Sequence, residues 1–212
     1  MKLLVLFAPL VVFLCVLVYG IVHSLFASTS IKSFVRRSFG SHTDRWYRLA
    51  YNIFAIISLL PVLALPALLP DKPIYVVTSP WIYLMLLGQV LAVGLLLVGL
   101  LQTGLWSFLG FRQFVTGDVR NETHMVVGGL YRFVRHPLYT AGLIFIWLAP
   151  VMTNNLFTLN LGLSIYIVFG AYLEERRLEQ EFGAAYRNYK KSTPMLVPFL
   201  GSRSARDETL LE

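Results

Sequence analysis

Residues 3–26 read LLVLFAPLVVFLCVLVYGIVHSLF and contain no charged side chain. An α-helix needs about 20 predominantly apolar residues to cross the hydrocarbon core of a bilayer. The stretch exceeds the apolar core of a signal peptide, and Leu25-Phe26-Ala27 is a poor match to the small-residue pattern of a cleavage site. It therefore predicts a membrane-spanning helix that is retained in the protein.

The rest of the chain has the same apolar character. Of its 212 residues, 57% are hydrophobic and 14% are charged, whereas a soluble domain carries about 25% charged residues. One core of this size cannot bury so much apolar surface, so lipid must cover part of it. We expect an all-α integral membrane fold with one domain over residues 1–200 and a disordered tail at 201–212. The five expected membrane-spanning helices lie at about 3–26, 49–69, 80–105, 138–152 and 156–173.

The last two of these helices are expected to form a tight hairpin. Residues 137–173 carry no charge, and a single helix of that length would measure about 55 Å, against a hydrocarbon core of about 30 Å. Asn154-Asn155 lies near the middle of the stretch and is typical of a turn.

The formal net charge of +7 is unevenly distributed. Lys and Arg are enriched after the first and third predicted helices, and not in the connectors on the other side. The positive-inside rule then predicts a multi-pass cell membrane protein with the N-terminus outside and the C-terminus in the cytoplasm. An anionic bilayer surface accounts for the basic residues, so we expect no nucleic-acid partner.

The densest group of polar residues is 128–139, GGLYRFVRHPLY. Pro137 favours a helix start here, because its missing N–H costs nothing in a first turn. The N–H groups of that turn, together with Arg135 and His136, could hold a carboxylate or phosphate, and the glycines allow close backbone approach. The alternative is a basic segment at the membrane interface.

Glu174-Glu175 is expected where the last membrane helix leaves the bilayer. Acidic residues at a helix C-terminus oppose the helix dipole, and a positively charged ligand would relieve this. The alternative is an intrahelical pair of Glu174 with Arg177. Because the two polar groups bracket the predicted hairpin, both should lie on the cytoplasmic side, within reach of one zwitterionic cofactor.

His23 lies near the end of the first predicted helix. A lone histidine in an apolar run usually makes hydrogen bonds between helices. A role on the substrate side of an active site is the alternative.

The motif at residues 129–139, followed by Glu174-Glu175, carries a family resemblance. Over about residues 125–198 the chain resembles the isoprenylcysteine carboxyl methyltransferase and phospholipid methyltransferase superfamily. Residues 23–28 (HSLFAS), 48–52 (RLAYN) and 109–113 (LGFRQ) resemble the NnrU-like proteins and the methanethiol S-methyltransferases.

The resemblance implies an S-adenosylmethionine-dependent methyltransferase with its cofactor at the C-terminal half, and we expect no metal ion. The helix-start argument adds Arg135 to the cofactor site. The residues that the resemblance assigns to the cofactor are Thr123, His124, Met125, Val126, Tyr131, His136, Pro137, Leu138, Tyr139 and Glu174.

One position departs from the carboxyl methyltransferases of the superfamily. They have an arginine, thought to meet the substrate, one helical turn before the glutamate, where this chain has Gly170. The departure fits a small or lipophilic neutral acceptor, such as a thiol, better than a prenylcysteine carboxylate.

Methyl transfer from a sulfonium is an in-line displacement, which requires alignment of the acceptor and exclusion of water. A thiol must also lose a proton, and Glu175 or His23 is the expected catalytic base. Three alternatives stay open. They are an isoprenylcysteine-type carboxyl O-methyltransferase, an NADPH-dependent reductase of the steroid 5α-reductase type in which Arg132 and Arg135 bind phosphates, and a non-catalytic NnrU-like membrane protein.

Overall fold

The computed structural model describes residues 2–116 and 125–198, and most of these residues are helical. Thr123, His124 and the predicted tail at 201–212 lie outside the described residues. In chain order the elements are α1 (Lys2–Ala27), α2 (Thr29–Phe39), η1 (Ser41–Thr43), α3 (Asp44–Leu68), β1 (Pro73–Val76), α4 (Trp81–Gln102), α5 (Leu105–Leu109), α6 (Phe111–Thr116), η2 (Gly129–Arg132), α7 (Pro137–Trp147), β2 (Val151–Thr153), α8 (Asn154–Phe182) and α9 (Ala184–Ser192).

Within the described ranges, four helical segments are long and apolar enough to cross a membrane. Many of their large apolar side chains are exposed, among them Leu6 at 72% and Ile57 at 62%. Such exposure is expected where lipid covers a helix. The four segments overlap four of the five helices predicted from the sequence, and they are Leu3–Ala27, Ser41–Leu68, Trp81–Gln102 and Asn154–Phe182. The predicted helix 80–105 ends three residues earlier in the structure, at Gln102.

The helix predicted at 138–152 is shorter in the structure. Helix α7 has 11 residues, Pro137–Trp147, and so rises about 16 Å at 1.5 Å per residue. Pro150 follows closely, and a proline has no N–H to continue a helix. The predicted length was therefore wrong, and α7 by itself covers about half of a bilayer core.

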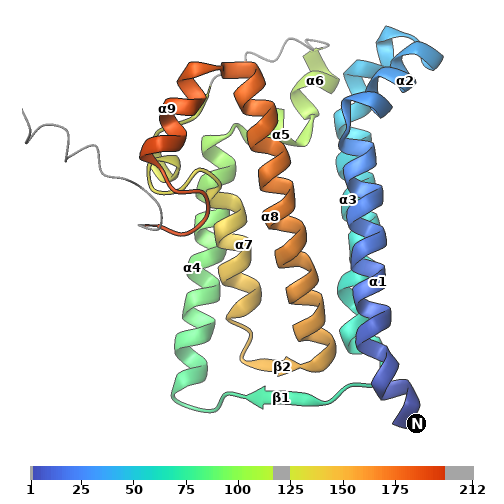
Figure 1. Ribbon diagram of the computed structural model, residues 1–212, viewed down its shortest axis with the longest axis vertical. Helices are drawn as coiled ribbons and strands as arrows, with labels where there is room; N and C mark the ends of the chain where they lie inside the picture. The colour runs from blue at the N-terminus through green and yellow to red at the C-terminus, as the bar shows by residue number, and fades with distance from the viewer. Residues whose placement is uncertain (1, 117–124, 199–212) are drawn as a thin grey trace, which may run out of the picture.

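A two-stranded sheet replaces the rest of that predicted helix. Strand β2 pairs antiparallel with β1, and Val151 lies opposite Val76. The all-α prediction did not include this sheet, which joins the connector after α3 to the connector before α8 at the lower end of the bundle (Figure 1).

Asn154 and Asn155, predicted to form a turn, are the first residues of α8 instead. The Asn155 backbone N–H donates to both carboxylate oxygens of Asp71, at 3.2 Å each, and the Asn155 side chain donates to the Pro70 carbonyl at 3.2 Å. The Thr153 hydroxyl accepts from the Leu156 N–H and caps the helix. Partners from the connector after α3 thus satisfy a helix start that the sequence pattern alone reads as a turn.

Helix α8 is longer than predicted and continues to Phe182. Its 29 residues span about 43 Å. Glu174 and Glu175 therefore lie two turns before its end, so the helix-dipole argument made from the sequence does not apply to them.

Helix α8 lies between the pair α1 and α3 and the pair α4 and α7 (Figure 1). Val12 and Val16 of α1, Val62 of α3 and Leu159 of α8 form a buried apolar cluster. At Gly162 the α8 backbone approaches Val16 closely, because glycine has no side chain to keep the helices apart. This packing brings the upper ends of α7 and α8 together with α9.

Candidate functional site

The start of α7 is bonded to the chain segment that follows α9. The Arg135 N–H donates to the Pro194 carbonyl at 2.9 Å, and the His136 N–H donates to the Met195 carbonyl at 3.1 Å. The Thr140 hydroxyl donates to the Leu196 carbonyl at 2.7 Å. These two backbone N–H groups, which immediately precede the first turn of α7, are thus occupied by protein carbonyls.

Glu175 is 3% exposed and both of its carboxylate oxygens are paired. Oε1 accepts from Arg135 Nε at 2.6 Å and lies 3.3 Å from His136 Nε2. Oε2 lies 3.2 Å from Lys190 Nζ. Arg135 also donates from Nη1 to the Lys190 and Thr193 carbonyls, at 3.0 and 2.6 Å. The carboxylate therefore ties α7, α8 and α9 together.

Glu174 has a different environment from its neighbour. Its side chain is 38% exposed, and Oε2 accepts a hydrogen bond from the Tyr139 hydroxyl at 2.8 Å. The same oxygen lies 3.7 Å from His136 Nδ1. The His136 and Tyr139 rings stack, with centroids 5.3 Å apart. The two rings hold one side of the Glu174 carboxylate and leave the other side accessible.

Glu174 faces a cavity of about 520 Å³ between α4, α7, α8 and α9. Eight of the residues predicted to bind the cofactor line it: Met125, Val126, Tyr131, Arg135, His136, Leu138, Tyr139 and Glu174. Pro137 is buried at the helix start and is not among the lining residues, and neither is Glu175.

The other lining residues were not assigned from the sequence. They are Leu96, Leu100, Thr103, Leu178, Glu181, Phe182, Tyr186 and Tyr189. The leucines from α4 could not be identified from the sequence, because an apolar residue in a membrane helix can face either lipid or a cavity. Tyr186 and Tyr189 of α9 stand within residues 125–198, the stretch that carries the family resemblance, and this resemblance was the signal that could have identified them.

Two of the tyrosines that line this cavity, Tyr131 and Tyr189, connect the elements around it. The Tyr189 hydroxyl donates to the Tyr131 carbonyl at 2.5 Å, which joins α9 to η2. Burial raises the pKa of Tyr189 to about 12. Burial, with a smaller contribution from the Glu174 charge, raises the pKa of Tyr131 to about 12. Both phenols therefore stay protonated at neutral pH and can act as hydrogen-bond donors.

Gly129 allows η2 to pack against the end of α4. Its φ is +60°, a region that favours glycine, and a β-carbon here would overlap with the Gln102 side-chain amide. Gln102 Oε1 accepts from the Leu130 N–H at 3.1 Å. This contact sets the position of Tyr131, which lines the cavity.

The substitution Gly129→Ala is therefore expected to destabilise the protein by about 1–3 kcal/mol, from backbone strain and the lost Gln102 contact. Gly128→Ala is the matched control, because its φ is −92° and a β-carbon there meets nothing within 4 Å. The measurement is the midpoint of thermal unfolding in detergent, followed by tryptophan fluorescence. Equal midpoints for the two variants would contradict the role of Gly129.

His23 does not line this cavity. It lies in α1, where Nδ1 is 2.5 Å from the Tyr166 hydroxyl of α8 and Nε2 is 2.7 Å from the Tyr51 hydroxyl of α3. The structure therefore places His23 in hydrogen bonds between three helices, as expected for an intramembrane histidine.

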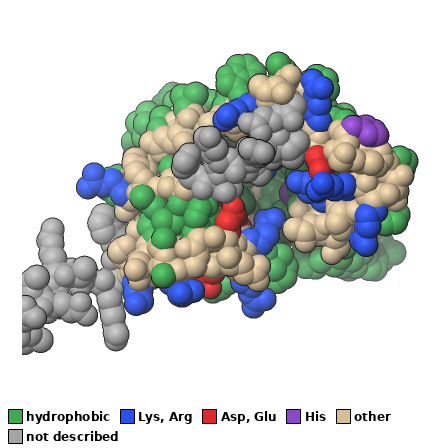
Figure 2. Space-filling view, turned by 90° about the horizontal axis from the view of Figure 1, so that it is seen from above, with side chains coloured by type: hydrophobic (Ala, Val, Ile, Leu, Met, Phe, Trp, Pro, Cys, Tyr) green, Lys and Arg blue, Asp and Glu red, His purple; other side chains and the backbone are tan. Residues whose placement is uncertain are grey.

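The cavity lies near the end of the molecule that carries α2, α6 and α9. Figure 2 shows this end from above, with many Lys and Arg side chains and a few Asp and Glu side chains among them. The basic residues of the elements at this end include Lys32, Arg36, Arg37, Arg45, Arg112, Arg187, Lys190 and Lys191. The opposite connector, at 69–80, has Lys72 next to Asp71.

Comparison with known proteins places the chain among methyltransferases. The phospholipid methyltransferase family matches residues 87–185. A methanethiol S-methyltransferase from Pseudomonas sp. (strain GM41(2012)) is 31% identical over 206 residues, which cover 87% of this chain and 74% of that protein. No solved structure matches the chain.

Two other relatives match over shorter segments. A methanethiol S-methyltransferase from Pseudomonas deceptionensis is 37% identical over 112 residues, and a protein-S-isoprenylcysteine O-methyltransferase from Schizosaccharomyces pombe is 32% identical over 92 residues. These matches cover 42% and 38% of the relatives' own length. The chain belongs to the superfamily of the phospholipid, methanethiol and isoprenylcysteine methyltransferases.

Proposed function

We propose that this chain is an integral membrane methyltransferase that takes a methyl group from S-adenosylmethionine and transfers it to a small or lipophilic thiol. The observation that carries the proposal is the meeting of Glu174, Tyr139 and His136 at one cavity between α4, α7, α8 and α9. Family membership supplies the reaction type.

The residues at the cavity fit the chemistry of this cofactor. The Glu174 carboxylate suits an ammonium group, and the rings of Tyr131, Tyr186 and Tyr189 suit a sulfonium or a purine. Apolar side chains from α4 and α8, which are Leu96, Leu100, Leu178 and Phe182, cover another part of the wall. When bound, S-adenosylmethionine supplies an electrophilic methyl group, and the protein has to orient it and exclude water.

Glu175 fits a positioning role better than the role of base predicted from the sequence. A base must reach the proton of the acceptor, whereas both Glu175 oxygens are paired with groups of α7 and α9. His136 lies between the two carboxylates, so Glu175 helps to hold the imidazole that faces the cofactor cavity. His23 remains the candidate base.

The alternatives receive less support from the site. For an NADPH-dependent reductase, Arg132 and Arg135 would have to bind phosphate. The Arg135 guanidinium is engaged by Glu175 and two backbone carbonyls, and Arg132 is not among the residues that line the cavity. For carboxyl methylation of a prenylated cysteine, Gly170 offers no cation to the carboxylate. The relatives named as methanethiol S-methyltransferases favour the thiol.

We further propose that the basic end of the bundle faces the cytoplasm, since Lys and Arg are enriched on that side of bacterial and other cell membranes. The N-terminus would then lie outside and the cofactor cavity would open to the cytoplasm. In this arrangement α7 is the fifth membrane helix, shorter than the other four.

The test is a calorimetric titration of the purified protein with S-adenosylmethionine and, separately, with NADPH. Labelled methyl transfer to thiol, prenylcysteine and phospholipid acceptors follows. We expect S-adenosylmethionine to bind and a thiol to be methylated. Binding of NADPH without S-adenosylmethionine would contradict the proposal, and cofactor binding with no methylated acceptor would point to a non-catalytic membrane protein.

A further inference from the structure

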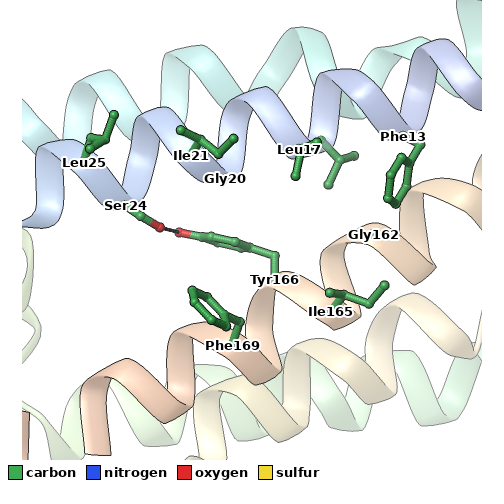
Figure 3. Close-up of a pocket in the computed structure, with 11 residues that line it drawn as sticks. Phe13, Leu17, Gly20, Ile21, Ser24, Leu25, Gly162, Ile165, Tyr166 and Phe169 are labelled. Carbon is green, nitrogen blue, oxygen red and sulfur yellow. Dashed lines mark hydrogen bonds between the residues drawn. The ribbon is translucent and has the colours of Figure 1, made fainter. Parts of the chain in front are cut away.

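A second cavity, of about 430 Å³, lies between α1 and α8. Its walls are apolar, and Ile21, Phe169 and Ile165 on its rim are 52%, 59% and 56% exposed. Figure 3 shows the two helices close together near Gly162 and diverging towards Ser24. Because both helices qualify as membrane spans, the exposed rim of this groove faces the hydrocarbon of the bilayer.

The groove has one polar end. Of the residues that line it, only Ser24 and Tyr166 have polar side chains, and none is charged. Their hydroxyl groups lie 3.4 Å apart. Behind Tyr166 stands His23, whose other ring nitrogen contacts Tyr51 of α3. A ligand that matches this lining is uncharged and apolar, with a single polar group at one end.

The groove and the cofactor cavity lie on neighbouring faces of α8. Tyr166, Gly170 and Glu174 follow one another at four-residue intervals, and each interval turns the side-chain direction by about 40°, so Gly170 stands between the other two in height and in direction. Tyr166 borders the groove and Glu174 borders the cavity. A β-carbon on Gly170 would meet nothing within 4 Å. The space beside Gly170 is therefore open, although Gly170 itself lines neither the groove nor the cavity.

We propose that the groove between α1 and α8 binds the methyl acceptor, an apolar thiol that arrives from the bilayer and reaches the methyl donor past Gly170. This inference rests on the proposed function and adds the acceptor site to it. The uncharged lining and the single polar end select a neutral thiol over an acceptor that carries a carboxylate.

The reaction balances with groups that the chain supplies. The thiol sulfur forms a bond to the methyl carbon, the bond from that carbon to the sulfonium sulfur breaks, and its electron pair stays on the donor sulfur. The thiol proton passes to the Tyr166 oxygen while Tyr166 gives its own proton to His23 Nδ1. This route gives His23 its role as base without contact between His23 and the groove.

Gly170→Leu tests the passage between the two sites. Leucine favours a helix more than glycine does, so α8 should stay intact. We expect the affinity for S-adenosylmethionine to stay within about twofold, while kcat/KM for hexanethiol falls at least about tenfold, because a misplaced acceptor loses the alignment of the displacement. Gly94→Leu in α4 is the matched control, since its β-carbon also meets nothing within 4 Å but it lines neither site.

Two results with Gly170→Leu would overturn the inference. One is methylation of hexanethiol at the wild-type rate, which would mean that the thiol does not pass Gly170. The other is loss of S-adenosylmethionine binding, which would mean that Gly170 faces the cofactor instead of the acceptor.

Ile21→Trp tests the groove itself. The larger side chain should fill the space next to Tyr166, and we expect KM for hexanethiol to rise at least about tenfold, with a smaller rise for methanethiol. Leu10→Trp is the control, because Leu10 is on the same helix, is 51% exposed against 52% for Ile21, and does not line the groove. Equal KM values for the two variants would contradict the acceptor site. If the wild-type protein methylates no thiol at all, the proposed function fails first.

Discussion

The substitution Glu175→Ala is expected to lower the free energy of unfolding by about 3–5 kcal/mol, because it leaves buried charge without a partner. The Glu175 carboxylate is 3% exposed, and the side chain of Arg135 beside it is 10% exposed. Lys190 and His136 contact the same carboxylate. Loss of the carboxylate would therefore weaken the contacts that hold α7, α8 and α9 together around the cofactor cavity.

The midpoint of thermal unfolding in detergent, with and without S-adenosylmethionine, measures this effect. Glu179→Ala is the matched control on the same helix, because the Glu179 side chain is 34% exposed and pairs with Lys190 at 2.7 Å. An exposed pair contributes about 0–1 kcal/mol. If both alanine variants unfold at the same temperature, Glu175 does not hold α7, α8 and α9 together.

Glu174→Gln is expected to weaken the binding of S-adenosylmethionine by about 10- to 100-fold, as the loss of a charged hydrogen bond implies. Glutamine keeps the size of the side chain and an oxygen that can accept from Tyr139. The change therefore removes the negative charge that would face the ammonium group and disturbs little else.

Isothermal titration with S-adenosylmethionine and with S-adenosylhomocysteine checks this prediction. Both ligands carry the ammonium group and only the first carries the sulfonium, so equal losses would assign Glu174 to the ammonium. Glu181→Gln is the control, since Glu181 lines the same cavity and also loses one charge. A loss of affinity in Glu181→Gln and none in Glu174→Gln would place the ammonium elsewhere.

Local sequence accounts for the membrane class and for most of the helices. A single apolar run such as 3–26 forms a helix in lipid, because a helix pairs the backbone N–H and C=O groups within the segment and no water is there to bond them. The motif at 129–139 and Glu174 are recognisable for a similar reason, since their residue types carry the chemistry. Eight of the predicted cofactor residues do line one cavity.

The division of work between Glu174 and Glu175 was decided by the tertiary structure. Adjacent residues on a helix point about 100° apart, so one carboxylate meets Arg135 and Lys190 while the other faces the cavity. The dipeptide by itself does not show which glutamate is buried and which faces the cavity. Glu175 was chosen as a base from the sequence without knowledge of where α9 packs, and that position is set only when the chain folds back on itself.

The lengths of the helices in the C-terminal half also depend on contacts with distant parts of the chain. The apolar run 137–173 predicts two helices, and its composition is equally compatible with the observed short α7, strand β2 and long α8. Pairing with β1 and the hydrogen bonds to Asp71 select the observed break.

Residues 3–26 by themselves predict a membrane protein, because the apolar composition and the length of a segment decide whether it can span a bilayer. Which polar groups meet across the bundle depends instead on directions and distances between helices. The pairing of Arg135 with Glu175 and the contacts of His23 with two tyrosines join residues far apart in the chain. Only the packing of α1, α3, α7, α8 and α9 brings them together.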